Sequence, residues 1–304
     1  MTALTPQFFR LLEADTKVIF FQEFMQLELL REKLFATRTS SKGYEDRMEM
    51  AGLGPFVVKS EGTPVSFSDP VQGGQVRTVH STYGLGGRFS MEVMQDDQFG
   101  MMRQIPGDMG NSARDHKDRI AFDLLNDAFN GTTYTGVAGQ PLFNTAHTRL
   151  RPGVATQSNQ LSPAVALSVS GLEAIMNLAK TTLSHEGRYI TLAPDRLLIH
   201  PNLAHNAYVL LNTEFRPGSS DNDRSTVVSS RSGITTIVES PYMTSTTAWS
   251  VHAPPGKNGL TINNRMGLEM TSAVDPDTKD MKHYAIYRES VQTDNWEGNF
   301  GSNS

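Results

Sequence analysis

The sequence contains no cysteine, which excludes disulfide bonds, thiolate zinc sites and cysteine nucleophiles. Long apolar runs are absent too: the stretch 18–21 is followed at once by Gln22 and Glu23. A membrane-spanning helix needs about 20 apolar residues, and the N-terminus lacks the basic-then-apolar layout of a signal peptide. We therefore expect a protein that folds in a reducing cytoplasm and has no membrane partner.

Basic residues are too few for a dedicated nucleic-acid-binding domain. The chain has 27 Lys and Arg against 32 Asp and Glu, a net charge of -5, and no basic run interleaved with aromatic residues. Such a surface repels phosphate backbones more than it binds them. The 304 residues suffice for a sizeable core, in one large domain or two.

No motif for catalysis or metal binding stands out. Among the 8 histidines, His200 and His205 do not share a helical face with a carboxylate, and no HExxH motif occurs. The glycines at 84–87 lack both GxGxxG spacing and a phosphate-binding lysine. Asp96 and Asp97 are adjacent, so on a helix they point about 100° apart. We assign no catalytic, cofactor-binding or metal-ligating residue and predict that the protein is not an enzyme.

The clearest helix spans residues 112–129. Its apolar side chains recur with a period of 3.6 and form one stripe, namely Ile120, Leu124, Leu125, Ala128 and Phe129. Ser112 and Asp115 predict a capping box, and Asn130-Gly131 predicts the stop. An earlier helix could start at Asp96-Asp97, and Pro106-Gly107 would kink or end it. We expect one long helix, with a break left open, between two β regions.

Residues 1–36 are predicted to form an amphipathic helical arm. Two apolar runs mark it: Phe8, Leu11, Leu12, and then Phe20, Phe24, Leu27, Leu30, Leu34. An arm of this kind cannot bury so much apolar surface alone, so it docks on its own body or on a neighbour. We predict that it serves assembly, and that removing it leaves the body folded. Residues 37–53 are polar and poorly periodic, which predicts an extended linker.

Residues 55–89 show short apolar bursts separated by turn residues, including Glu61-Gly62 and Gly73-Gly74. This pattern predicts a long two-stranded β-hairpin with little apolar content. An isolated hairpin is marginally stable in water, so we expect this one to lie on another surface.

The remaining chain alternates helices, strands and loops, which makes the fold class α+β. Helices are predicted at 168–184 and 202–212, strands at 196–200, 235–239, 248–252, 260–263 and 283–293, loops at 131–165 and 213–232, and a polar tail at 298–304.

Several short motifs resemble, in their order and spacing, the major head subunit of phage Mu and its relatives. They are Thr82-Tyr83-Gly84, Arg88-Phe89-Ser90, Asp96-Asp97, MGNSA at 109–113, Leu124-Leu125 with Phe129, and GQPLFNTAH at 139–147. The resemblance covers about residues 37–298. That family is similar in fold to the tailed-phage major capsid proteins of the Hong Kong 97 type.

The resemblance implies a Hong Kong 97-like capsid fold in five parts. These are an N-terminal arm (1–54), an extended β-hairpin loop (55–89), a peripheral domain with a long spine helix (90–164), an axial domain (165–258), and a return to the peripheral domain with a C-terminal tail (259–304).

The implied function is that of a major capsid protein. Its copies would form pentamers and hexamers of an icosahedral shell around a double-stranded DNA genome, in a virion assembled in the host bacterial cytoplasm. No long charged helical extension precedes residue 50, so a separate scaffolding protein is implied. Portal protein and decoration proteins are further expected partners, and packaged DNA is contacted only non-specifically. The alternatives are an encapsulin-like compartment and a cytosolic α+β hydrolase.

Some capsids of this fold join an extended-loop lysine to an asparagine of a neighbour. Lys59 is the only lysine in residues 55–89, and Asn263 and Asn264 lie in a late segment that could approach it. Because Lys59 is predicted near the base of the hairpin rather than its tip, we expect a solvated lysine and no cross-link.

Overall fold

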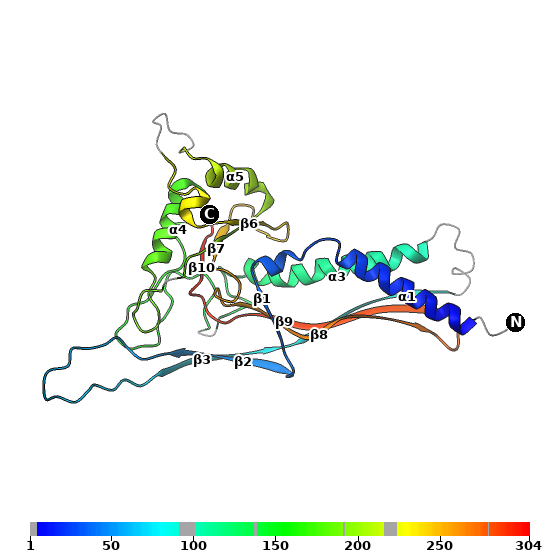
Figure 1. The fold of residues 1–304 in the computed structure, drawn as a ribbon, viewed down its shortest axis with the longest axis horizontal. Coiled ribbons are helices and arrows are strands. Elements are labelled where there is room, and N and C mark those ends of the chain that lie inside the picture. Colours follow the sequence, from blue (N-terminus) through cyan, green and yellow to red (C-terminus); the bar gives the residue numbers. More distant parts are fainter. Residues whose placement is uncertain (1–4, 91–100, 137–138, 191, 216–223, 279) are drawn as a thin grey trace.

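The computed structural model describes residues 5–90, 101–136, 139–190, 192–215, 224–278 and 280–304. Figure 1 shows a long, twisted sheet with two helices lying along it, a compact body of shorter strands and helices at one end, and a separate ribbon below the sheet. The two sheets and the ribbon thus form three distinct parts of one α+β fold.

The elements follow the chain in this order. The helices are α1 (Thr5–Phe24), η1 (Leu30–Lys33), α3 (Met101–Asn126), α4 (Val169–Thr181), η2 (Pro201–Leu203), α5 (Ala204–Asn212) and α6 (Ser229–Ser232). The strands are β1 (Ala36–Thr39), β2 (Tyr44–Ala51), β3 (Val71–Val79), β4 (Ser81–Phe89), β5 (Arg196–Ile199), β6 (Thr236–Glu239), β7 (Trp249–His252), β8 (Leu260–Val274), β9 (Met281–Thr293) and β10 (Asn299–Ser302).

The long sheet has the order β1-β8-β9-β4. The antiparallel pair β8 and β9 forms its centre, with Leu260 opposite Thr293 at one end and Val274 opposite Met281 at the other. β4 lies antiparallel to β9, and β1 lies parallel to β8. The predicted strand 260–263 is therefore much longer than expected, because polar and half-exposed residues continue the ladder beyond the apolar start.

The central helix α3 is continuous through Pro106, so the break left open in the sequence does not occur. Gly107 and Gly110 have a packing role instead, because they let α1 cross α3 closely. A Cβ on Gly110 would lie 2.4 Å from the carbonyl oxygen of Phe20. Ser112 lies inside the helix and is not its cap, and α3 ends at Asn126 rather than 129.

The predicted stop at Asn130-Gly131 lies in the turn after α3, where Gly131 has a positive φ of 61°. The proposed helix start at Asp96-Asp97 lies outside the described residues.

The arm docks on its own body. Phe20 of α1 is fully buried against α3 and β8, and Leu34 and Phe35 lie in the main core. The prediction that residues 1–36 could be removed without loss of folding is therefore wrong, since removal would open this core. The predicted linker 37–53 is wrong as well, because β1 and β2 occupy most of it.

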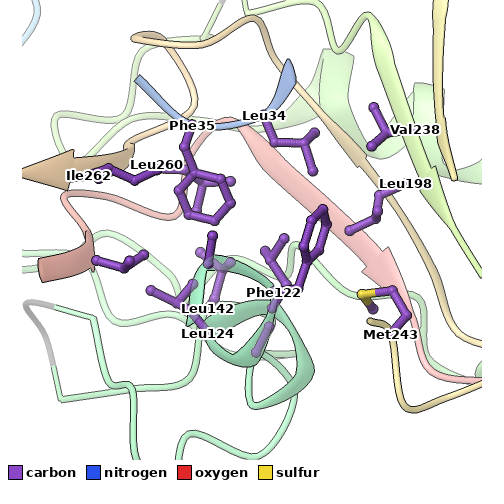
Figure 2. Packing of buried hydrophobic residues seen from close by; sticks show 14 of the residues in the cluster. Leu34, Phe35, Phe122, Leu124, Leu142, Leu198, Val238, Met243, Leu260 and Ile262 are labelled. Carbon is purple, nitrogen blue, oxygen red and sulfur yellow. The ribbon is translucent and has the colours of Figure 1, made fainter. Parts of the chain in front are cut away.

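The main core joins the two sheets beneath the end of α3. Figure 2 shows Phe122 and Leu124 of α3 facing Leu260 and Ile262 of β8, with Leu198 of the second sheet close by. All five side chains are at most 2% exposed. The two sheets therefore share one apolar interior.

The second sheet has the order β10-β7-β5-β6. Its core packs α4 and α5 around Trp249, whose Nε1 donates to the carbonyl oxygen of Val165. The predicted helices and strands of this region are confirmed. The predicted polar tail is wrong: β10 pairs with β7, and its polar residues Asn299 and Ser302 are fully buried with hydrogen-bond partners.

The ribbon is formed by β2 and β3, paired from Tyr44 opposite Val79 to Ala51 opposite Val71. The predicted hairpin 55–89 is therefore displaced along the chain, since its second expected strand, β4, belongs to the long sheet. Charged residues on both faces of β2 hide it from an apolar pattern.

Candidate assembly surfaces

Residues 52–70 connect β2 to β3 and project from the body at the end of the ribbon (Figure 1). We call this segment the projecting loop. Its large apolar side chains are exposed to an unusual degree: Leu53 60%, Phe56 107%, Val57 64%, Val58 98%, Val65 61% and Phe67 94%. A contiguous exposed apolar segment of this kind marks an interaction surface.

A turn forms the tip of the projecting loop. The N–H and the hydroxyl of Thr63 both donate to the carbonyl oxygen of Ser60, at 3.2 Å and 2.7 Å. Lys59 lies beside this turn and is exposed, so its predicted place near the base of the hairpin is wrong. The prediction of a turn at Glu61-Gly62 is confirmed. The flanking strands lie farther from this turn than expected, since β2 ends at Ala51 and β3 begins at Val71.

The base of the projecting loop is fixed to the body. Arg151 donates to the carbonyl oxygen of Gly52 at 3.5 Å and to Ser68 Oγ at 2.6 Å, and so it ties the two limbs together. The N–H of Gly52 donates to Glu186 Oε1 at 2.6 Å. The loop is thus anchored at its base and exposed toward its tip.

The ribbon carries a second row of exposed side chains, including Met48, Met50 and Val79. Across the strands, Arg77 donates to both carboxylate oxygens of Asp46 at 2.7 Å and 2.9 Å, and its guanidinium lies 4.0 Å from the centre of the Tyr44 ring. These contacts hold the two strands together while leaving the apolar side chains free to contact another molecule.

A cavity of about 210 Å³ lies between α3 and the long sheet. Its aromatic wall is formed by Tyr83 of β4, His116 of α3 and Tyr287 of β9. His116 Nδ1 and the Tyr287 hydroxyl are 2.6 Å apart, and the two tyrosine rings lie 5.2 Å apart. Burial raises the pKa of Tyr287 well above its usual value, so this hydroxyl stays protonated. The cavity is mainly apolar and has no array of acid and base groups.

A buried charge cluster connects the arm to the body. Arg31 pairs with Glu289 at 2.5 Å, and Lys117 lies 3.9 Å from the same carboxylate. Asp118 accepts the N–H groups of Leu30 and Arg31 at 3.2 Å and 3.1 Å. Burial raises the pKa of Asp118, against these hydrogen bonds. Each charge has a partner inside the fold, so the cluster is structural.

The histidines and the asparagine considered as site candidates in the sequence analysis do not form a common site in the structure. His200 caps η2 by accepting the N–H of Asn202, while His205 is exposed on α5. Asn263 is 2% exposed within β8. Among the residues that the structure describes, no group of three His, Asp or Glu side chains has the geometry of a metal site. Asp96 and Asp97 lie outside those residues.

None of the helices in the described part of the chain is long and apolar enough to cross a membrane.

Sequence patterns missed the contacts that hold the arm and the ribbon in place. The pairs Arg31 with Glu289 and Glu49 with His185 join residues far apart in the chain. No local spacing of residues predicts such pairs. A charged residue within an otherwise apolar segment is the one sequence feature that indicates a buried partner.

Comparison with solved structures shows what class of fold this is. The structure is similar to the capsid of cyanophage P-SCSP1u, with a TM-score of 0.57 and 16% identity over 90% of this chain and 88% of that chain. The mature capsid of bacteriophage PhiM1 gives a TM-score of 0.56 and 11% identity over 90% and 86%. A virus-like particle from Pyrococcus furiosus gives 0.54 and 9% over 95% and 98%.

The long sheet beneath a spine helix, the compact second sheet and the projecting ribbon thus form a Hong Kong 97-type capsid fold, as the sequence predicted. No curated protein matches the sequence. A family model described as phage capsid protein matches residues 75–298, and the chain belongs to this family. It is a phage major capsid protein, a shell-forming structural subunit. The encapsulin-like alternative is not favoured, and neither is a hydrolase.

Proposed function

We propose that many copies of this chain close into an icosahedral shell of pentamers and hexamers around a packaged double-stranded DNA genome. The observation that carries this proposal is the projecting loop, which is anchored at its base and exposes six large apolar side chains that its own subunit does not cover. A neighbouring copy is the surface that would bury them. Contacts that repeat by rotation close into rings, and rings of two sizes give a curved, closed shell.

The capsid domains are proposed as follows. The long sheet with α3 forms the peripheral domain, and the second sheet with α4 and α5 forms the axial domain. The ribbon with the projecting loop, residues 44–79, is the extended loop. β8 and β9 form the return to the peripheral domain, and the C-terminal strand β10 pairs with β7 in the axial domain, which supports a boundary after β9.

The projecting loop would contribute to assembly mainly by burying apolar area. Its exposed aromatic and branched side chains release water when they dock, at about 25 cal/mol per Å² of apolar area. Phe56 and Phe67 are the strongest anchors, since both are almost fully exposed and aromatic side chains dominate interface energetics. The cavity beside Tyr83 and Tyr287, under the spine helix, offers an apolar receiving surface on the neighbouring copy.

We propose further partners on the basis of the capsid class. They are a scaffolding protein during assembly in the host cytoplasm, a portal protein and decoration proteins. DNA contact would be non-specific, in keeping with the net charge of -5.

Electron microscopy of the purified full-length protein tests the proposal. We expect closed shells with five-fold and six-fold rings, and double-stranded DNA inside particles taken from lysed host cells. If the protein remains a monomer or dimer at concentrations where capsid proteins assemble, the proposal of a shell is overturned. Shells that hold a cargo enzyme instead of DNA would support a compartment of the encapsulin kind.

A further inference from the structure

A buried polar cluster lies where β2 passes into the projecting loop. Glu49, near the end of β2, turns its carboxylate into the body, where it meets His185 from the turn after α4. Glu297, from the segment before β10, approaches the same ring nitrogen of His185 from a longer distance. Three segments far apart in the sequence therefore meet at the base of the loop.

The geometry of the cluster is that of an ion pair with an extra carboxylate. His185 Nε2 lies 2.8 Å from Glu49 Oε1 and 3.9 Å from Glu297 Oε1. The side chains of Glu49 and His185 are only 7% and 8% exposed. Glu49 Oε2 and His185 Nδ1 have no hydrogen-bond partner among the described residues. Within the described part of the chain, the recorded ion pair of the Glu49 carboxylate is the one with His185.

The charges around His185 favour its protonated form. Glu186, on the same turn, is a third carboxylate, and hydrogen bonds from Ser184 and Gly52 overcome burial to lower its pKa. Besides His185, the positive charge of Arg149, on the segment between α3 and α4, opposes the rise that burial causes in the pKa of Glu297. His147 also faces the cluster, but burial lowers its pKa to about 4, so it is neutral at physiological pH.

The pKa of His185 follows from this balance. Burial opposes the charged imidazolium, but the hydrogen bond to Glu49 and the charges of Glu49, Glu297 and Glu186 outweigh it and raise the pKa. Burial raises the pKa of Glu297 too, against the effect of His185. Both groups bind protons more tightly in the closed cluster than when exposed to water. The stability that His185 contributes is complete below the ordinary histidine pKa and is lost as the pH rises through its raised pKa. The contribution of Glu297 is complete only below the ordinary glutamate pKa and is lost as the pH rises through its own raised pKa.

We propose that Glu49, His185 and Glu297 form a proton-controlled latch that fixes the direction of the projecting loop, closed while the His185 imidazolium keeps its proton and released when that proton is lost. Loss of the proton leaves Glu49 buried beside a neutral ring and near a second carboxylate, which favours separation of β2 from the body. Arg151 and Glu186 still hold Gly52, so the loop loses its fixed direction but not its attachment.

Paired spin labels measure the direction of the loop directly. The chain has no cysteine, so Ser60→Cys at the loop tip and Lys180→Cys on α4 give two specific, exposed labelling positions in the full-length protein. We expect a narrow distance distribution at about pH 6 and a broad one at about pH 9, on the two sides of a raised histidine pKa. The same distribution at both pH values would overturn the proposal.

Substitutions assign the effect to the latch. The side chain of His185→Asn cannot take up a proton, so the distance distribution of this variant should be broad at both pH values. The matched control His205→Asn, exposed on α5, should respond as the parent does.

Glu297→Gln keeps the pair of Glu49 with His185 and removes one negative charge, so the midpoint of the change in the distance distribution should move to lower pH. A pH response that persists in His185→Asn, or a midpoint unmoved by Glu297→Gln, overturns the latch. Should His185→Asn fail to fold, the Glu297→Gln midpoint decides.

Discussion

Arg31 and Glu289, 258 positions apart in the chain, form a buried ion pair in which Nη1 lies 2.5 Å from Oε1. The arginine side chain is 5% exposed and the glutamate 1%. The pair holds η1 against β9, and the adjoining residues Leu34 and Phe35 fill the main core. The last part of the arm is thus a structural element of its own subunit.

Arg31→Ala should lower the free energy of unfolding by about 3 kcal/mol, because Glu289 is left buried with only Lys117, at 3.9 Å, to balance it. Urea denaturation of the unassembled chain measures this. Arg38→Ala is the matched control: its ion pair with Asp294 is partly exposed and should contribute less than about 1 kcal/mol. Equal losses of unfolding free energy in the two variants would show that burial does not determine how strongly the Arg31–Glu289 pair stabilises the fold.

Gly110→Ala should destabilise the fold although alanine is the better helix former. The gain in helix propensity is about 1 kcal/mol. The added Cβ would lie 2.4 Å from the carbonyl oxygen of Phe20, so α1 must move away from α3, at a cost of about 2 kcal/mol or more. A lower melting temperature is expected, whereas Gly267→Ala, with open space around its Cβ position, should leave it nearly unchanged. A higher melting temperature for Gly110→Ala would contradict the close crossing.

How far the sequence predicts this fold depends on where each element buries its side chains. The helix α4 and the strands β5 and β7 were predicted because one face or both faces are apolar and buried. The ribbon strand β2 was missed because it projects from the body and carries charges on both faces. β10 was missed because its polar residues are buried through hydrogen bonds, which leave no apolar pattern.

The candidate assembly surface was predicted in kind but not in position. The low apolar content of residues 55–89 for their length predicted a hairpin that lies on another surface. Which segments pair within it depends on the pairing of β4 with β9, about 200 positions away, and no local pattern contains that information. The anchor residues Arg151 and Glu186 are also remote in sequence from Gly52, by 99 and 134 positions, and both contact it.

Acid should destabilise the subunit through His252. Burial lowers the pKa of His252 to about 4, against the hydrogen bond to Asn299. Because the folded-state value is depressed, the stability is present above the ordinary histidine pKa and is lost as the pH falls toward about 4. The loss is on the order of 3 kcal/mol. Urea denaturation across this range should show a smaller pH dependence in His252→Asn than in the parent, and an unchanged one in His205→Asn. An equal pH dependence of the unfolding free energy in the parent and in both variants would contradict the assignment of this loss to His252.

Assembled particles that are boiled in denaturant should run as monomers on a gel. Lys59 is exposed beside the loop tip, but the side chain of Asn263 is buried in β8, between β1 and β9. A neighbour's lysine could reach it only if this sheet opened. A ladder of multimers in the parent, absent in Lys59→Arg, would contradict this and establish a covalent cross-link.

Replacing residues 53–69 by a short glycine-serine turn should separate folding from assembly. Ala51 and Val71 are opposite each other at the end of the ribbon, so a short turn closes it without strain. Most of the replaced side chains are exposed, among them Phe56 at 107% and Phe67 at 94%, so little buried area is lost. We expect the melting temperature of the unassembled subunit to fall by only a few degrees, an effect on the order of 1 kcal/mol.

Closed particles of the shortened chain should be absent in the electron microscope, because the apolar contact with the neighbouring copy is gone. The double variant Phe56→Ser and Phe67→Ser, which keeps the loop length, should lower the particle yield as well. Normal shells from the shortened chain would show that the projecting loop does not join the subunits.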